Sequence, residues 1–99
     1  MASIRGAAVI LKNARMANVQ DRVIEVTARV LQLDASDVKP EHNFTTDLGA
    51  ESVQSIELVA MFEEEFGIEM DEDGALAVTT VGSAAEFIAG VCKEQGVEV

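Results

Sequence analysis

The feature that most constrains the fold is a run of apolar residues at helical spacing. Spacings of four, three, four and three separate Val19, Val23, Val26, Val30 and Leu33. This period places them on one face of an α-helix, whereas a half-buried strand would alternate apolar and polar residues. Asn18 is a suitable N-cap, and Asp21 lies in the first turn, where the helix dipole favours negative charge. The sequence therefore predicts an amphipathic helix that begins after Asn18.

Two further segments have the composition of helices. Residues 52–66 are rich in Glu and in Leu-type helix formers, and Gly67 suits the position after a helix C-terminus. Thr80 is a suitable N-cap for a final helix, whose apolar residues are Val81, Ala84, Ala85, Phe87, Ile88 and Val91. We also predict a short helical turn around residues 75–78. Because the chain has no internal repeat or hairpin signature, these segments predict an all-α fold, a small bundle of three main helices plus one short helix.

The remaining segments set the domain boundaries in a chain of 99 residues, which is the length of one domain. Residues 1–17 hold three cations and no acid, and we predict a flexible N-terminal extension there. The predicted domain covers residues 18–92, and residues 93–99 are expected to fray. Residues 34–51 form a loop long enough to be functional or to hold a helical turn of its own. The residues expected to pin this loop to the core are Val38, Phe44 and Leu48.

The charge of the chain excludes two classes of partner and favours a third. Its 18 acids and 7 Lys and Arg residues give a net charge of −11, and residues 41–99 hold all but four of the acids. Nucleic-acid binding needs cations to neutralise phosphates, and an anionic membrane surface repels such a protein. We therefore expect a monomer with no nucleic-acid partner and no membrane insertion. The uneven charge predicts a functional acidic face for protein partners that carry basic patches.

Reactive side chains are scarce in this sequence. It contains one Cys (Cys92), one His (His42), and neither Trp nor Tyr. A single Cys excludes an intramolecular disulfide and a zinc knuckle, and it is typical of a reducing compartment such as the cytoplasm. We predict that Cys92 is a core residue and that His42 lies in a loop, exposed or hydrogen-bonded locally. The sequence therefore favours a protein that is not an enzyme.

The predicted helix at residues 52–66 has two different faces. At 100° per residue, the core face comprises Leu58, Val59, Phe62 and Phe66. The opposite face comprises Val53, Glu57, Ala60 and Glu64, and Ile56 lies between the two. Exposed apolar residues bordered by carboxylates are unfavourable unless a partner covers them, so we interpret this outer face as a partner-binding surface. The alternative, in which single exposed Val and Ala residues have no role, stays open on this feature alone.

Ser52 lies at the start of this helix, just after Gly49 and Ala50. A hydroxyl at this point is available for modification. The free amides and the positive dipole end of a helix N-terminus stabilise an attached phosphate by about 0.3–1 kcal/mol. Without further context, an ordinary Ser near the N-cap is the commoner explanation.

The neighbouring residues supply that context. The stretch Asp47-Leu48-Gly49-Ala50-Glu51-Ser52-Val53 resembles the attachment motif of acyl carrier proteins, usually Asp-Leu-Gly-Ala/Gly-Asp-Ser-Leu. The resemblance continues along the helix at residues 52–66 to Thr79-Thr80-Val81, and it covers residues 18–92. Together with the length, the acidity and the predicted helices, it identifies the chain as similar to this family.

The resemblance implies that Ser52 bears 4′-phosphopantetheine, transferred from coenzyme A by a Mg²⁺-dependent phosphopantetheinyl transferase. It implies that the arm carries acyl groups as thioesters between enzymes of fatty-acid or related synthesis, and that the acyl chain lodges between the helices. It also implies partner contacts at Glu51, Val53, Ile56, Glu57, Ala60 and Glu64. Three residues depart from the usual motif, namely Glu51, Val53 and Gln54, which leaves open a carrier for a specialised acyl or polyketide pathway. The Gly-Gly-His-Ser pattern of peptidyl carriers is absent.

Three other functions compete with this interpretation. An unmodified acidic helical adaptor would bind a basic protein partner through the same outer face. A Ca²⁺ site of the EF-hand type is suggested by Glu69, Asp71 and Asp73, but Thr80 stands where the loop needs a bidentate Glu. A serine hydrolase would need Gly-x-Ser-x-Gly, and Gln54 occupies the second Gly position. We therefore predict neither a metal site nor a catalytic site.

Overall fold

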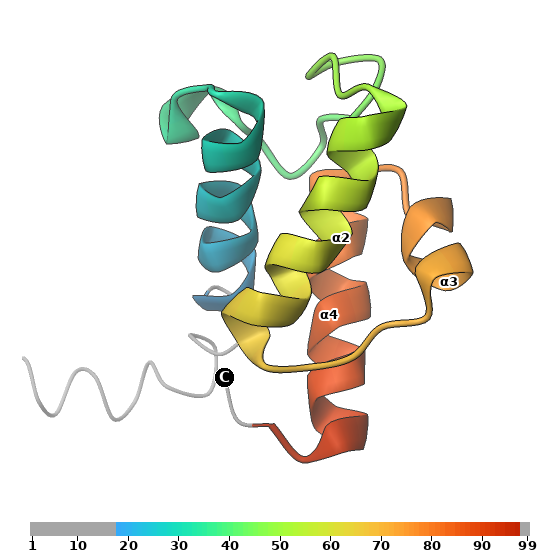
Figure 1. Ribbon diagram of the computed structural model, residues 1–99. Coiled ribbons are helices and arrows are strands. Elements are labelled where there is room, and N and C mark those ends of the chain that lie inside the picture. The colour runs from blue at the N-terminus through green and yellow to red at the C-terminus, as the bar shows by residue number, and fades with distance from the viewer. Residues whose placement is uncertain (1–17, 98–99) are drawn as a thin grey trace, which may run out of the picture.

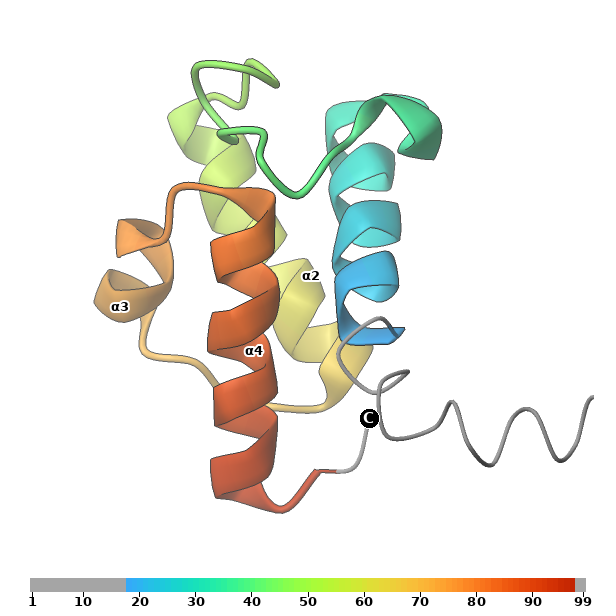
Figure 2. The ribbon, with the colours of Figure 1, turned by 180° about the vertical axis from the view of Figure 1, so that it is seen from behind.

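The computed structural model describes residues 18–97, so the extension predicted at residues 1–17 lies outside the described residues. The described chain forms the N-terminal helix (residues 18–31), the 3-10 turn η1 (Ala35–Asp37), and the helices α2 (Ser52–Phe66), α3 (Glu72–Ala77) and α4 (Val81–Gln95). The N-terminal helix and α3 lie on opposite sides of the molecule, with α2 and α4 between them (Figures 1 and 2). The all-α bundle of three main helices plus one short helix is confirmed. None of these helices is both long and apolar enough to cross a membrane.

Capping residues fix the ends of three helices. α2 ends before Gly67, which has a left-handed φ of 65° and donates its N–H to the carbonyl of Glu63, as the sequence predicts. α4 begins after Thr80, whose Oγ1 accepts a hydrogen bond from the Ser83 N–H at 3.2 Å. α3 begins earlier than the turn predicted at residues 75–78, because the Asp71 side chain accepts from the Gly74 N–H at 2.9 Å and caps the helix there.

The N-terminal helix differs from the prediction at both ends. Asn18 is already helical, so it does not act as the predicted N-cap. At the other end, Gln32 adopts a left-handed φ of 58° and the helix stops before Leu33, which is 38% exposed. The prediction that Leu33 belongs to the core face is therefore wrong. Periodicity gave no sign of this end, because left-handed residues at helix C-termini are usually Gly.

α4 continues beyond Lys93, where we expected the chain to fray. The helix runs to Gln95, and Gly96 then adopts a left-handed φ of 72°. The Val97 N–H donates to the Cys92 carbonyl at 2.8 Å, a hydrogen bond that closes the helix end. The Gln95 side chain also bonds both backbone groups of Glu69, at 3.1 Å to its N–H and 2.6 Å to its carbonyl. These contacts hold the last turn against the segment between α2 and α3.

The core lies between the three long helices and includes the loop that precedes α2. Its most deeply buried apolar residues are Val19, Val23, Val26, Val81, Ala85, Ile88 and Cys92. Val38 and Phe44 are also buried and Leu48 packs against the core, so these residues pin the loop to the core as predicted. The predicted core face of α2 is confirmed at Leu58, Phe62 and Phe66.

Arg22 joins the N-terminal helix to the last turn of α2. Its Nε lies 3.0 Å from Glu65 Oε2, and its terminal nitrogen donates to the Glu65 backbone carbonyl at 2.8 Å. Its guanidinium carbon lies 4.3 Å from the centre of the Phe66 ring. A cation at a helix C-terminus and over an aromatic face is favourable on both counts, so Arg22 fixes how these two helices pack.

Thr27 is the buried polar residue of this core. It is 0% exposed, and its Oγ1 has no hydrogen-bond partner within residues 18–97. A buried hydroxyl without a partner costs about 1–3 kcal/mol. We therefore expect Thr27→Val, which puts a methyl group in place of the hydroxyl, to raise the free energy of unfolding in urea by about 1 kcal/mol. Thr27→Ala also removes the hydroxyl but leaves a cavity, and it should give no gain. A Val variant less stable than the wild type would contradict this account.

Candidate functional site

Ser52 is the first residue of α2, and it is exposed. The preceding residue, Glu51, is the N-cap, and its backbone N–H donates to Gln54 Oε1 at 3.0 Å. Gln54 departs from the usual attachment motif, and its capping role was not predicted, although a polar residue at the third helical position is a signal for it. The amides of Ser52 and Val53, the first two helical residues, have no acceptor within the helix. The Ser52 hydroxyl is therefore presented to solvent beside free N–H groups at the positive end of the helix dipole.

Asn43 organises the loop that leads to Ser52. Its Oδ1 accepts three hydrogen bonds, from the Thr45 N–H at 2.9 Å, the Thr45 hydroxyl at 2.8 Å and the Thr46 N–H at 3.1 Å. Its own N–H donates to Asp47 Oδ2 at 2.7 Å. Asn and Asp side chains commonly bond to backbone groups a few residues away, and this tendency is the signal that could have identified Asn43 from sequence. The network fixes the turn immediately before the Asp47-Leu48-Gly49 stretch.

Backbone hydrogen bonds also fix this loop to the start of α4. The Phe44 N–H donates to the Thr79 carbonyl at 3.0 Å, and the Ala50 N–H donates to the Phe44 carbonyl at 2.8 Å. Between them Gly49 adopts a left-handed φ of 74°, a conformation that favours glycine. The loop can therefore turn sharply into α2 while staying attached to the bundle. The position of Ser52 is set by this attachment as well as by its own helix.

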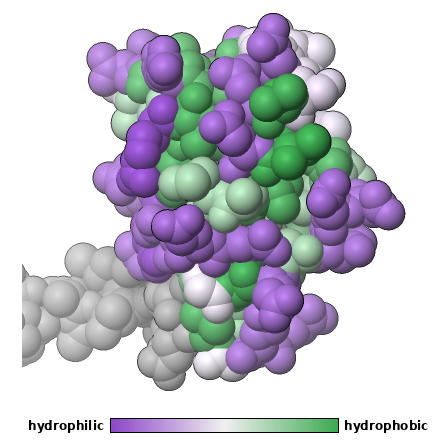
Figure 3. Space-filling model, in the orientation of Figure 1, coloured by the Kyte–Doolittle hydropathy of each residue, from purple (hydrophilic) through white to green (hydrophobic). Residues whose placement is uncertain are grey.

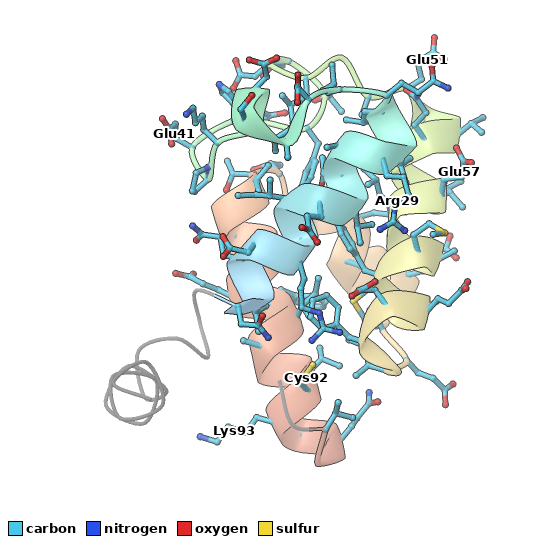
Figure 4. All side chains as sticks on the ribbon, turned by 90° about the vertical axis from the view of Figure 1, so that its left-hand side faces the viewer. Arg29, Glu41, Glu51, Glu57, Cys92 and Lys93 are labelled. Atoms are coloured by element: carbon cyan, nitrogen blue, oxygen red, sulfur yellow. The ribbon has the colours of Figure 1, made fainter. Side chains whose placement is uncertain are left out.

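All six residues predicted to contact partners are exposed: Glu51, Val53, Ile56, Glu57, Ala60 and Glu64. The two largest apolar ones, Val53 and Ile56, are 71% and 52% exposed. Figure 3 shows apolar side chains gathered over the N-terminal half of α2, with hydrophilic ones around them. In Figure 4 Glu51 and Glu57 point away from the bundle, and Arg29 of the neighbouring helix extends toward α2. This surface suits a partner that offers an apolar contact surrounded by cations.

A cavity of about 110 Å³ lies between α2, α3 and α4. Its walls include Leu58 and Phe62 from α2, Leu76 from α3, and Phe87 from α4. Its polar lining residues are uncharged, and one of them, Ser55, lies a single turn beyond Ser52 on α2. The cavity therefore reaches the side of α2 that carries Ser52. Some of the walls are recognisable in the sequence as core residues, but the volume is not, because the cavity arises where α3 packs against the two longer helices.

The remaining candidate reactive residues, namely the acidic residues, Cys92 and His42, do not form a common site in the described part of the chain. No group of three or more His, Cys, Asp or Glu side chains within residues 18–97 lies close enough to hold a metal ion. Cys92 is buried, as predicted, and this burial raises the pKa of its thiol, so little reactive thiolate forms. His42 Nδ1 accepts a hydrogen bond from the Lys39 N–H at 3.0 Å, the local bond that the sequence predicts. Cys92 and His42 therefore take part in core packing and in a local loop hydrogen bond, respectively.

Comparison with known families adds an independent finding. Residues 21–88 match a family model described as a phosphopantetheine attachment site. The matched segment covers more than half of the chain and contains the loop organised by Asn43, all of α2 and α3, and the first half of α4. It therefore includes Ser52, the outer face of α2 and the helices that enclose the cavity.

Proposed function

The chain belongs to the phosphopantetheine-attachment family, and on that basis we propose that it is an acyl carrier protein with its arm on Ser52. The prosthetic group of this family is covalent 4′-phosphopantetheine. The observation that carries the assignment to Ser52 is its exposed hydroxyl at the first residue of α2. Free amides of the first turn lie beside that hydroxyl and favour a phosphate group, so the residues present fit the phosphate end of the arm.

In the proposed modification, Ser52 Oγ attacks the phosphorus that joins the arm to the adenosine part of coenzyme A. A new P–O bond forms at Ser52, the pyrophosphate P–O bond breaks, and adenosine 3′,5′-bisphosphate leaves. The hydroxyl proton passes to a base of the phosphopantetheinyl transferase, which also holds the Mg²⁺. The attached arm supplies a thiol that forms thioesters with acyl groups. The chain itself catalyses no step: it holds the arm at a fixed point and presents the acyl group to other enzymes.

We also propose that the outer face of α2 docks the transferase and the acyl-processing enzymes. Val53 and Ile56 offer an apolar contact, and Glu57 and Glu64 border it with negative charge. Such a surface favours partners with basic patches, because opposite potentials steer association. The proposed pathway is fatty-acid synthesis or a specialised acyl or polyketide synthesis, in a reducing compartment such as the cytoplasm.

The test is to load the purified apo protein in vitro. The full chain is incubated with coenzyme A, Mg²⁺ and a phosphopantetheinyl transferase of broad specificity, and its intact mass is then measured. We expect a gain of one 4′-phosphopantetheine, which fragmentation should locate on Ser52. Absence of any gain, or an arm located on another residue, would contradict the proposal.

A further inference from the structure

The exposed apolar side chains of the outer face of α2 form one contact rather than two isolated ones. Within residues 18–97 the exposed large hydrophobic residues are Leu33, Val53, Ile56 and Leu76. Val53 and Ile56 are three residues apart on α2, so their side chains are neighbours on the helix surface. Leu33 and Leu76 belong to other segments and stand singly. The pair on α2 is therefore the apolar contact that another apolar segment would cover most effectively.

The N-terminal segment (residues 1–17), which lies outside the described part of the chain, has the composition that complements this face. It holds three cations, Arg5, Lys12 and Arg15, and no acid. Residues 7–11, between two of these cations, have the wholly apolar sequence Ala-Ala-Val-Ile-Leu. The segment thus combines an apolar stretch with flanking cations. This is the chemistry that the outer face of α2, with its apolar pair and bordering carboxylates, favours in a partner.

The N-terminal segment joins the bundle next to α2. Arg22, about one turn into the N-terminal helix, contacts Glu65 in the last turn of α2 at 3.0 Å, and the two helix ends lie side by side in Figures 1 and 2. Ile56 precedes Glu65 by nine residues, which is about 14 Å along the helix axis. Ile10 precedes Asn18 by eight residues, which span up to about 27 Å. The segment is therefore long enough to reach the whole outer face.

The charges of the N-terminal segment also match those of α2 in spacing. Glu57 and Glu64 are seven residues apart, so about 10 Å of helix separates them. Lys12 and Arg15 are three residues apart, and three residues of extended chain also span about 10 Å. A chain that runs from Asn18 along α2 can therefore bring Arg15 to Glu64. The same course brings Lys12 to Glu57.

Attachment to the same chain makes a weak contact sufficient. Exposed ion pairs contribute little to stability one by one, so the segment as a free peptide would bind the face poorly. A tether of a few residues, however, gives an effective concentration in the millimolar range. A segment that binds with a millimolar dissociation constant would then cover the face for about half to two thirds of the time.

We propose that the N-terminal segment docks on the outer face of α2 in the same molecule and competes there with protein partners. Arg15 lies beside Glu64 in this contact, and residues 7–11 cover the apolar pair. The contact is autoinhibitory, because the face is open to another protein only while the segment is released. This consequence rests on the docking role proposed above for the outer face, whereas the contact itself does not.

The experiment uses the full chain with the substitution Val9→Trp. The chain contains neither Trp nor Tyr, so fluorescence from this position reports on the N-terminal segment alone. The measurement is the rate constant with which acrylamide quenches that fluorescence. We expect it to rise by about 2–3-fold when Lys12→Glu and Arg15→Glu are added, because a segment docked half to two thirds of the time is then released. High salt should give the same release, since the Debye length at 1 M is about 3 Å.

The matched control is Lys39→Glu with Lys93→Glu. These substitutions change the net charge by the same amount at exposed positions outside both the segment and α2, and they should leave the quenching unchanged. The same two pairs, without the Trp, test the competition in stopped-flow measurements with the transferase. Lys12→Glu with Arg15→Glu should associate about 2–3-fold faster than the control pair, because both have the same net charge and only the former frees the face.

Exchange of the charges gives the sharpest test of the contact. Adding Glu57→Lys and Glu64→Lys to Lys12→Glu and Arg15→Glu restores opposite charges across the contact and should restore the protection from acrylamide. Protection that fails to return would overturn the inference, and so would equal quenching in all variants or equal release by the control pair. Protection that increases with protein concentration would also overturn it, because the segment would then dock on a second molecule.

The outcome of this experiment is independent of the carrier function. Failure to load an arm at Ser52 would refute the proposed function without affecting the quenching result, since no step of the quenching experiment uses the arm. A protected Trp together with an unchanged association rate would overturn the autoinhibition. Quenching and association that change together, and only in the variants of the N-terminal segment, are the result that the inference predicts.

Discussion

Ser52→Ala is expected to abolish attachment of the arm completely, because the substitution removes the oxygen that forms the bond to phosphorus. The fold should be unaffected, since Ser52 is exposed and the N-cap of α2 is Glu51, closed by Gln54. Incubation with coenzyme A, Mg²⁺ and the transferase should therefore leave the mass of the variant unchanged. Its circular dichroism spectrum and thermal midpoint should match those of the wild-type apo protein.

The matched control for this variant is Ser55→Ala. Ser55 lies one turn further along α2, so the substitution removes the same group from the same helix. This variant should gain one arm, as the wild type does. An arm on Ser52→Ala, or a Ser55→Ala variant that gains none, would move the attachment point away from Ser52. An unmodified adaptor would behave differently again, because neither the wild type nor either variant would gain mass.

Reversing charge on the outer face should slow docking strongly. The double variant Glu57→Lys with Glu64→Lys places two cations on the outer face, where they would repel the basic patches proposed for the partners. We expect the association rate constant with the transferase to fall by about 10–100-fold at low salt. Stopped-flow measurements at increasing salt should show the difference shrinking, since the Debye length falls from about 30 Å at 0.01 M to about 3 Å at 1 M.

A second pair of substitutions distinguishes the effect of charge on the outer face of α2 from the effect of the overall net charge. Glu86→Lys with Glu94→Lys changes the net charge by the same amount at exposed positions of α4, which lies behind α2 in Figure 1. This pair should leave the association rate close to that of the wild type. Equal slowing by the two pairs would mean that overall charge, rather than the outer face of α2, governs docking.

Much of the fold could be predicted because its strongest signals are local. The bounds of α2 follow from residue period and from Gly67, whose lack of a side chain suits the left-handed turn. The N-cap Thr80 could also be predicted because its signal is local: its hydroxyl needs only a backbone N–H three residues away. In the sequence Asp71 has the position of a possible Ca²⁺ ligand, whereas in the structure its side chain caps α3. Composition alone could not distinguish these two uses of a carboxylate.

The features that could not be predicted depend on contacts between distant segments. The Arg22 contact with Glu65 joins residues far apart in sequence, and the hydrogen bond from Phe44 to Thr79 does the same. The cavity arises from the placement of α3 against α2 and α4, so no local pattern encodes its volume. The Ser52 hydroxyl and the outer face of α2 could thus be predicted from the sequence. The long-range contacts that hold them in place and the adjacent cavity could be seen only in the structure.

The most direct test of the central claim is the mass of this protein purified from its native source, combined with fragmentation to locate any added group. The account predicts a species that carries one 4′-phosphopantetheine, free or acylated, bonded to Ser52 Oγ. A protein with the mass of its unmodified chain in growing cells, or with the arm on a different residue, would contradict it.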